Sequence, residues 1–315
     1  MAGNFKEKRQ YQSMKIATTI GEMYPYASSP AETVRLYEGT GFRYLDYSFY
    51  YDHLENSPFM EESDIAWRKQ VEETALAAEE GKFQFVQAHA PGYNPLKESD
   101  YERSLRAMCR TVEACGKIGI PVTVLHTSYG RVHLYPVDKK PYLEYNRKFL
   151  APILETAEKY NVTVCIENTS SKNMGDCYFP RTPEDMNDFV SFIDHPLLKC
   201  CWDTGHAVME GKSNQREEFR KLGKNLKAVH IHDNNALSDQ HLAPYCGKLE
   251  VDSVVEGLLD IDFKGVFTFE VEAFLNRSNG QGPAKRPSLE MRRDAIALLY
   301  KTGKFILDSY GIFEE

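Results

Sequence analysis

The chain has 315 residues, of which 42% are hydrophobic and 27% charged, as in an ordinary globular protein with enough apolar material for a sizeable core. Its formal charge of -8 disfavours nucleic acid or an anionic membrane as a partner, because such binding depends on clusters of Lys and Arg. No stretch approaches about 18 uninterrupted apolar residues and the charged start has no apolar run after it, so we expect a cytoplasmic protein without a membrane segment.

Short segments rich in β-branched and aromatic residues alternate along the chain with amphipathic helical patterns. This alternation predicts parallel strands connected by helices. The predicted strands number eight and cover residues 15–19, 42–48, 83–89, 122–127, 162–168, 199–204, 226–233 and 266–272.

Three of the predicted helices begin with a capping residue that is followed three positions later by an acid, which satisfies free amides of the first turn. The capping residues are Ser29, Ser99 and Thr182. The helix after the third strand has an apolar stripe at Leu105, Met108, Cys109, Val112 and Cys115, which we expect to face the core. The last helix, from about 288 to 310, repeats the pattern with Met291, Ala295, Leu298 and Phe305 and would close the ring.

Eight such units could form either an open doubly wound sheet or a closed barrel. The open sheet usually carries a Gly-rich phosphate loop after its first strand, and residues 16–22 have no such loop. We therefore predict a (β/α)₈ TIM barrel in which residues 1–315 form a single domain. The seven cysteines include no C-x-x-C pair, so we expect reduced thiols rather than a zinc ribbon or a disulfide framework.

Residues able to bind a metal recur where the predicted strands end, which is where a barrel builds its active site. They are His89, His126, Glu167, Asp203, His232 and Glu270. Each alone would more often be a hydrogen-bonded core residue or a helix cap. Together they would be costly to bury without a compensating cation, so the pattern predicts a divalent metal site.

The period of two along a strand ranks some of these candidates. His230 and His232 share one face, and the later residue lies nearer the catalytic end, so we expect His232 to be the ligand and His230 to be packed. Glu270 and Glu272 also share a face, and parity leaves both open. Imidazole and carboxylate ligands without thiolate suit zinc, manganese, cobalt or iron better than calcium.

Six short motifs together resemble the xylose isomerase-like barrel superfamily over nearly the whole chain. They are HAP at 89–91, IEN at 166–168, WDTGHA at 202–207, HIHDNN at 230–235, DQH at 239–241 and FEVE at 269–272. The superfamily contains sugar isomerases and epimerases and also the endonuclease IV enzymes of DNA repair, and its two branches share much of a metal scaffold.

The resemblance to the ketose epimerase branch implies one divalent ion held by Glu167, Asp203, His232 and Glu270, with His206 contacting substrate. Zinc or manganese would be the first choice of ion, and cobalt, magnesium or iron would also be compatible. The implied activity is isomerisation or epimerisation of a sugar or sugar phosphate through an enediolate, with Glu167 and Glu270 exchanging protons. Oligomers are common in the superfamily, so a homo-oligomer is also expected.

The endonuclease IV branch gives the alternative, a phosphodiesterase with three zinc ions. Its additional ligands match His89, His126, His206, Asp239 and His241. The acidic balance and the contexts of residues 167–172 and 230–235 favour the sugar branch.

Loop residues add expectations about substrate contacts. Tyr245 stands where the branch's H-x-x-P-G-x-G loop usually has glycine, which puts the shape of that loop in doubt. Lys172 and Arg277 follow active-site strands and could bind a phosphate or carboxylate, although a solvated surface role is the more common one for such residues. Aromatic side chains after the second and third strands could stack on a sugar or serve as packing, and these are Tyr47, Phe49, Tyr50, Tyr51 and Tyr93.

Overall fold

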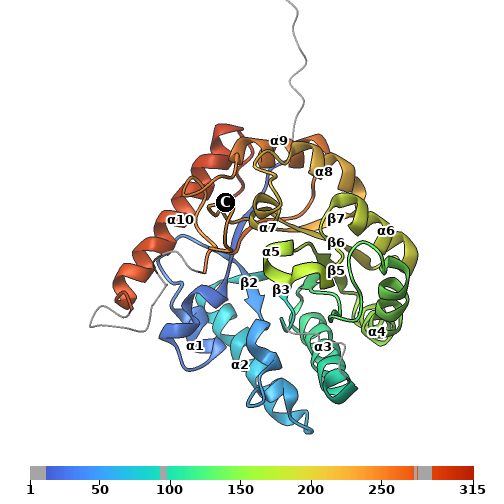
Figure 1. The fold of residues 1–315 in the computed structure, drawn as a ribbon. Helices are drawn as coiled ribbons and strands as arrows, with labels where there is room; N and C mark the ends of the chain where they lie inside the picture. The colour runs from blue at the N-terminus through green and yellow to red at the C-terminus, as the bar shows by residue number, and fades with distance from the viewer. Residues whose placement is uncertain (1–11, 93–97, 273–274, 276–285) are drawn as a thin grey trace, which may run out of the picture.

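A computed structural model describes residues 12–92, 98–272, 275 and 286–315, and its strands form a parallel barrel surrounded by helices (Figure 1). The strands are β1 (Ile16–Thr19), β2 (Tyr44–Ser48), β3 (Gln84–His89), β4 (Val122–Leu125), β5 (Thr163–Glu167), β6 (Leu198–Asp203), β7 (Leu226–His230) and β8 (Phe267–Phe269). They pair in the order β7-β6-β5-β4-β3-β2-β1-β8. All eight predicted strands and the (β/α)₈ fold are confirmed.

The barrel closes through backbone bonds between the ends of β7 and β8. Ile231 and Phe269 form a parallel bridge. The Ile231 amide donates to the Thr268 carbonyl at 2.8 Å, and the Glu270 amide donates to the Ile231 carbonyl at 3.2 Å. These bonds fix the backbone directly beside His232 and Glu270, two of the predicted ligands.

Helices cover the outside of the barrel, and short 3₁₀ turns connect several of them. The helices are α1 (Pro30–Arg35), α2 (Ile65–Gly81), α3 (Glu98–Ile118), α4 (Lys139–Tyr160), α5 (Ser171–Met174), α6 (Pro183–Ile193), α7 (Thr204–Met209), α8 (Arg216–Leu222), α9 (Val251–Asp260) and α10 (Leu289–Ser309). The 3₁₀ turns are η1 (Ile20–Tyr26), η2 (Tyr50–His53), η3 (Pro58–Met60), η4 (Gly175–Cys177) and η5 (Gly223–Asn225). None of the helices within the described ranges is long and apolar enough to cross a bilayer.

Two of the three predicted helix caps are confirmed. The Ser29 hydroxyl accepts from the Glu32 amide, and the Thr182 hydroxyl accepts from the Asp185 amide. α3 begins at Glu98, one residue before Ser99, so Ser99 does not precede that helix. The predicted stripe of α3 does face the core, with Met108, Val112 and Cys115 buried and the other two members packed against them. All seven cysteines are free thiols.

The last helix begins and ends as predicted, but its core face is different. Ala295 is buried, whereas the side chains of Met291, Leu298 and Phe305 are 51%, 53% and 64% exposed. The buried face consists of Arg292, Ala295, Ile296, Leu299, Gly303, Ile306 and Leu307. These residues recur at the helical spacings of three and four, whereas the exposed three are seven apart and follow a separate line along the helix.

Small side chains fill the barrel interior below the strand ends. Val124, Cys165, Cys201 and Ala228 form a buried cluster from four adjacent strands, β4 to β7. Successive residues of a strand alternate in direction, so the next inward positions on these strands are 126, 167, 203 and 230. The interior packing therefore places His126, Glu167, Asp203 and His230 in one layer above the cluster.

Candidate functional site

A cavity of about 460 Å³ opens at the C-terminal ends of the strands. Its lining includes His89, His126, Glu167, His206, Asp239, His241 and Glu270. Asp203 and His232 are fully buried and contact this lining, Asp203 through His206 and His232 through His241. The fold therefore brings together all nine residues that the sequence proposed for the site.

A larger cavity of about 590 Å³ lies at the other end of the barrel, around the start of β1 and β2. No histidine or cysteine lines it, and no group of metal-capable atoms among the described residues lies there. The smaller cavity, not the larger one, is therefore the candidate site.

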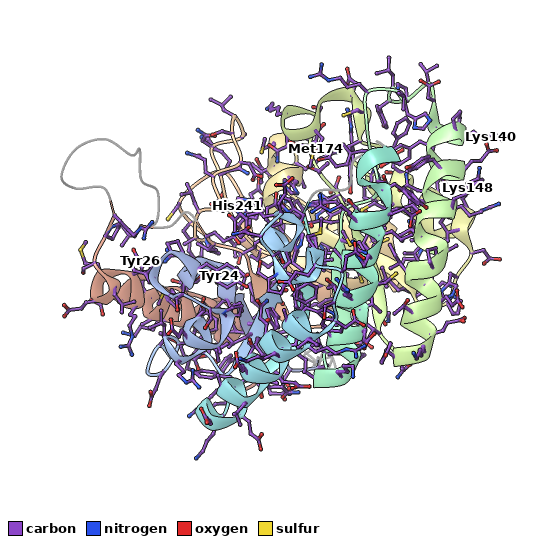
Figure 2. All side chains as sticks on the ribbon, turned by 90° about the horizontal axis from the view of Figure 1, so that it is seen from below. Tyr24, Tyr26, Lys140, Lys148, Met174 and His241 are labelled. Carbon is purple, nitrogen blue, oxygen red and sulfur yellow. The ribbon has the colours of Figure 1, made fainter. Side chains whose placement is uncertain are left out.

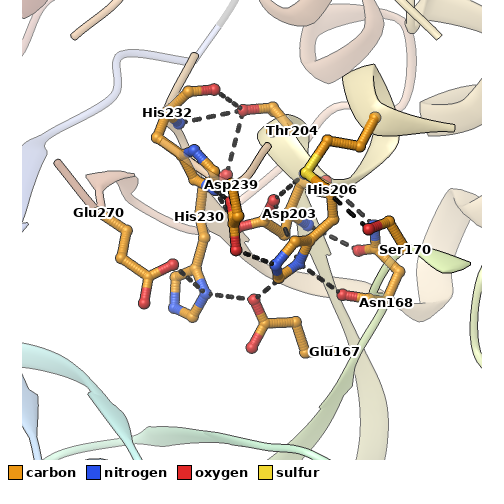
Figure 3. Close-up of polar contacts among 12 residues, drawn as sticks. Glu167, Asn168, Ser170, Asp203, Thr204, His206, His230, His232, Asp239 and Glu270 are labelled. Atoms are coloured by element: carbon orange, nitrogen blue, oxygen red, sulfur yellow. Dashed lines mark hydrogen bonds and ion pairs between the residues drawn. The ribbon is translucent and has the colours of Figure 1, made fainter. Parts of the chain in front are cut away.

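Glu167 lies at the centre of the site, at the end of β5, and is 1% exposed. Its Oε1 is 2.9 Å from His230 Nδ1. Its Oε2 has no hydrogen-bond partner but lies 3.3 Å from His89 Nε2 and 3.6 Å from His126 Nε2. Three imidazoles from three other strands thus surround one carboxylate (Figure 3 shows Glu167 and His230).

Asp203 and His232 form a second, fully buried pair at the ends of β6 and β7. His232 Nε2 lies 2.9 Å from Asp203 Oδ2. Asn168 fixes the Asp203 backbone, because its side chain accepts from the Asp203 amide at 2.7 Å and donates to the Asp203 carbonyl at 3.0 Å. A Cβ at Gly205 would lie 1.9 Å from Cε1 of His232, so the glycine of the WDTGHA motif makes room for this ring.

Glu270 follows β8 and meets Glu167 at His230. Its Oε2 is 3.4 Å from His230 Nδ1, the same nitrogen that contacts Glu167. Glu167, Asp203, His230 and Glu270 each offer a ligand atom, and these atoms all lie within 4.8 Å of one another. His230, expected to be a packed residue, is thus a further functional candidate that the sequence ranking missed.

His232 belongs to two neighbouring groups of ligand atoms. One consists of Asp203, His206 and His232, and the other of His232, His241 and Glu270. The His232 ring stacks on the His241 ring with centroids 4.1 Å apart. The predicted ligand set and the group containing His230 share Glu167, Asp203 and Glu270, and they differ only in the histidine.

Asp239 connects the outer histidines of the cavity, and Figure 3 shows its contact with His206. Its Oδ2 lies 3.1 Å from His206 Nε2 and 3.3 Å from His241 Nε2. The side chain of Asn173 donates to the same oxygen at 2.7 Å, which joins α5 to the loop after β7. Met174 and His241 line the cavity from these two segments, and Figure 2 shows both in the upper half of the molecule.

The buried carboxylate of Asp233 holds the loop after β7 in shape. It accepts from the amides of Gly247, Lys248 and Leu249 at 2.7 to 2.9 Å. Tyr245 has φ of 73°, a left-handed conformation that glycine adopts more easily. The loop thus uses at Tyr245 the backbone conformation that its usual glycine would favour.

The predicted aromatic contacts divide into packing and lining residues. Tyr47 and Phe49 are buried and stack with centroids 4.0 Å apart, whereas Tyr50 and Tyr51 line the cavity. Lys172 also lines it and donates to the Ala236 carbonyl at 2.6 Å. Tyr93 and Arg277 lie outside the described residues.

A buried arginine that the sequence analysis did not single out supports the segment carrying Glu270. Arg292 of α10 donates to the carbonyls of Val271 at 3.5 Å and Glu272 at 3.3 Å. It also donates to the Glu22 carbonyl of η1 at 3.2 Å. Its position in the buried stripe of α10 was the available signal, because a charged residue there needs polar partners.

The two candidate acid–base carboxylates have different electrostatic environments. Burial opposes ionisation of Glu167, but His230 and His126 hold its pKa well below the ordinary value. Burial raises the pKa of Glu270 to about 7, and His230 and His241 offset this only in part. One carboxylate is thus stabilised as the anion, whereas the other holds a proton near neutral pH.

The described residues fit a divalent cation. Nitrogen and carboxylate oxygen atoms converge without thiolate, as zinc or manganese would require. Two of the buried atoms, Glu167 Oε2 and His232 Nδ1, have no hydrogen-bond partner, which is costly unless another group satisfies them. A bound cation would satisfy such atoms and offset the buried negative charge.

Comparison with known proteins identifies the family and the fold. A family model described as xylose isomerase-like TIM barrel matches residues 34–300. An uncharacterised protein of Methanocaldococcus jannaschii is 29% identical over 190 residues, which are 59% of this chain and 64% of that protein. The chain spans between 56% and 66% of the length of the curated relatives it matches.

Two solved structures illustrate the likeness in fold. A D-psicose 3-epimerase of Clostridium cellulolyticum is 18% identical with a TM-score of 0.71, and the match covers 93% of this chain and 99% of the epimerase. An AP endonuclease, family 2, of Brucella melitensis is 16% identical with a TM-score of 0.62, covering 82% and 93%. At these identities the likeness shows the fold and leaves the reaction to the site.

Proposed function

Because the chain belongs to the xylose isomerase-like TIM barrel family, we propose that it is a divalent-metal-dependent isomerase or epimerase of a sugar or sugar phosphate. One observation carries this proposal: Glu167 and Glu270, which line the cavity from β5 and the end of β8, approach the same nitrogen of the buried His230. Epimerisation needs one group that removes a proton from carbon and another that returns one, and two convergent carboxylates supply this pair.

The side chains would divide the work as follows. Glu167 removes the proton from the carbon next to the sugar carbonyl, and Glu270 returns a proton, from the opposite face for epimerisation. Tyr50 and Tyr51 contact the C–H faces of the sugar and keep water from the reacting carbon.

Glu167, Asp203 and Glu270 would hold the ion, with His232 as the predicted nitrogen ligand and His230 as the one the geometry adds. When bound, it would polarise the carbonyl next to the reacting carbon. Zinc and manganese are the first candidates.

The test is exchange of substrate hydrogen with solvent in deuterated water, followed by mass spectrometry over a panel of ketoses, aldoses and their phosphates, with zinc or manganese added. We expect incorporation of one deuterium at a carbon next to the carbonyl. Replacing Glu167 by Gln should lower the rate on the order of 10²-fold or more, because a general base is lost. Glu184→Gln on α6 is the matched control, since Glu184 is exposed and far from the cavity. Full exchange by Glu167→Gln would overturn the assignment.

A specific observation also favours a second candidate, an endonuclease IV-like phosphodiesterase. Beyond the central set, His89, Glu167 and His230 form one group of ligand atoms, and His232, His241 and Glu270 form another. Several ions could therefore bind side by side. The formal charge of -8 disfavours a DNA substrate.

Metal stoichiometry combined with nicking of an abasic-site oligonucleotide separates the two candidates. One ion per chain, retained in His241→Ala, without nicking supports the sugar reaction. Two or three ions, reduced in His241→Ala, together with nicking support the phosphodiesterase.

A further inference from the structure

The outer face of α10 carries an apolar line that nothing within the described chain covers. Met291, Leu298 and Phe305 are 51%, 53% and 64% exposed. They are seven residues apart, which is nearly two helical turns, so they lie along one face of the helix. Figure 1 shows α10 at the outer edge of the ring of helices.

A charged line runs beside the apolar one. Asp294, Lys301 and Asp308 are also seven apart and exposed. Asp308 pairs with Lys304 at 2.9 Å. Asp294 and Lys301 form no ion pair with any described residue, and they flank Leu298 at nearly equal distances along the helix, four residues before it and three after it.

A hollow lies beside the N-terminal half of the same helix. Its volume is about 340 Å³, and it is lined by Gly39 and Thr40 after α1 and by Leu289, Glu290, Arg293, Asp294 and Ala297 on α10. The hollow lies on the side of the apolar line that carries Asp294, because Asp294 lines it. Lys301 lies on the same side, because residues four before and three after Leu298 are rotated the same way around the helix.

We propose that this face of α10 is a homodimer interface, in which two copies of α10 pair antiparallel about a twofold axis at Leu298. The pairing is self-complementary, as a twofold interface must be. Leu298 meets its own copy, and Met291 faces Phe305 of the second copy. Lys301 of each copy lies opposite Asp294 of the other, and each Phe305 enters the hollow beside Leu289 and Ala297.

A second copy fits this surface better than an unrelated protein does, because each feature finds its complement on the same helix. Asp294 and Lys301, which have no ion-pair partner among the described residues, lie where a twofold axis sets them against each other. The exposed ring of Phe305 has a hollow at the matching distance on the other side of the axis. Burying exposed apolar side chains of this size provides most of the driving force for such association.

The first test measures self-association of the full chain by sedimentation velocity over a wide range of concentrations. We expect a dimer whose dissociation constant rises on the order of tenfold or more in Leu298→Asp, because two carboxylates then face each other at the centre of the contact. Ile65→Asp is the matched control, since Ile65 is an exposed aliphatic residue on α2. It should leave the dimer unchanged.

The second test reverses the charges. Lys301→Asp should weaken the dimer, because it then faces Asp294, and the double change Asp294→Lys with Lys301→Asp should restore it. Circular dichroism checks that each variant is folded, and the substituted side chains are exposed in the single chain. A monomeric wild type, a dimer that withstands Leu298→Asp, or a double variant no tighter than Lys301→Asp would each overturn the proposal.

Discussion

Glu22 shows how one buried residue beside the site connects pH to stability. It is fully buried in η1, accepts from the Thr18 hydroxyl at 2.5 Å, and has one carboxylate oxygen without a hydrogen-bond partner. Burial raises its pKa from 4.5 to about 7, and Arg292 offsets this only in part. The folded chain therefore holds this proton more tightly than the unfolded chain does.

The raised pKa predicts a specific pH dependence. Because the folded value lies above the unfolded one, this residue's contribution to stability is complete below pH 4.5 and is lost as the pH rises through 7. Glu22→Gln removes the ionisation, so the variant should gain stability relative to wild type between pH 5 and pH 9, by at most about 3 kcal/mol. Urea unfolding of both proteins at several pH values measures it. A constant difference across this range would contradict the raised pKa.

At the scale of strands, the sequence predicted those features that depend on a local pattern alone. The eight strands could be predicted because each is a short apolar run between turn signals, and strand ends pointed to Glu167 and Asp203 because carboxylates stop such runs. The order of His230 and His232 was harder. The alternation of side chains along the strand showed that they share a face, but only the packed barrel shows how far each lies along the barrel axis from the inner layer of small side chains.

The inner layer contained a usable signal. Cys165, Cys201 and Ala228 are small residues two positions before Glu167, Asp203 and His230. Counting up from them places His230 level with the two carboxylates, and His232 one step higher. That count requires the register between strands, which depends on backbone pairing such as Glu167 with Cys201 and cannot be obtained from a single strand.

Helix α10 illustrates the limit of apolar periodicity. Its bounds were predicted from the extent of the apolar pattern, but two apolar lines coexist on it, and only tertiary contact determines which line is buried. The line through Ile296 and Leu299 packs into the core, and Arg292 on the same face donates to carbonyl groups after β8. Helical spacing therefore predicts which apolar residues share a face of the helix. The neighbouring elements determine whether that face is buried.

At the scale of the whole molecule, the candidate ligands come from four consecutive elements of the barrel, β5, β6, β7 and the end of β8. A cation would balance the buried carboxylates and satisfy Glu167 Oε2 and His232 Nδ1, two ligand atoms that lack a hydrogen-bond partner. An ion that binds only the folded barrel would join these elements and stabilise the whole chain by mass action.

Metal-linked stability therefore tests the site without any substrate. Thermal unfolding of chelator-treated protein should shift upward when zinc or manganese is added, because an ion at about 100 times its dissociation constant contributes about 2.7 kcal/mol. For a domain of this size that corresponds to a shift of several degrees. Glu167→Gln should lose most of the shift, whereas Glu184→Gln on the surface should keep it. If Glu167→Gln responded as strongly as wild type, the stabilising ion would bind away from the strand ends, and the carboxylates of β5 and β8 would have to be balanced by their histidines alone.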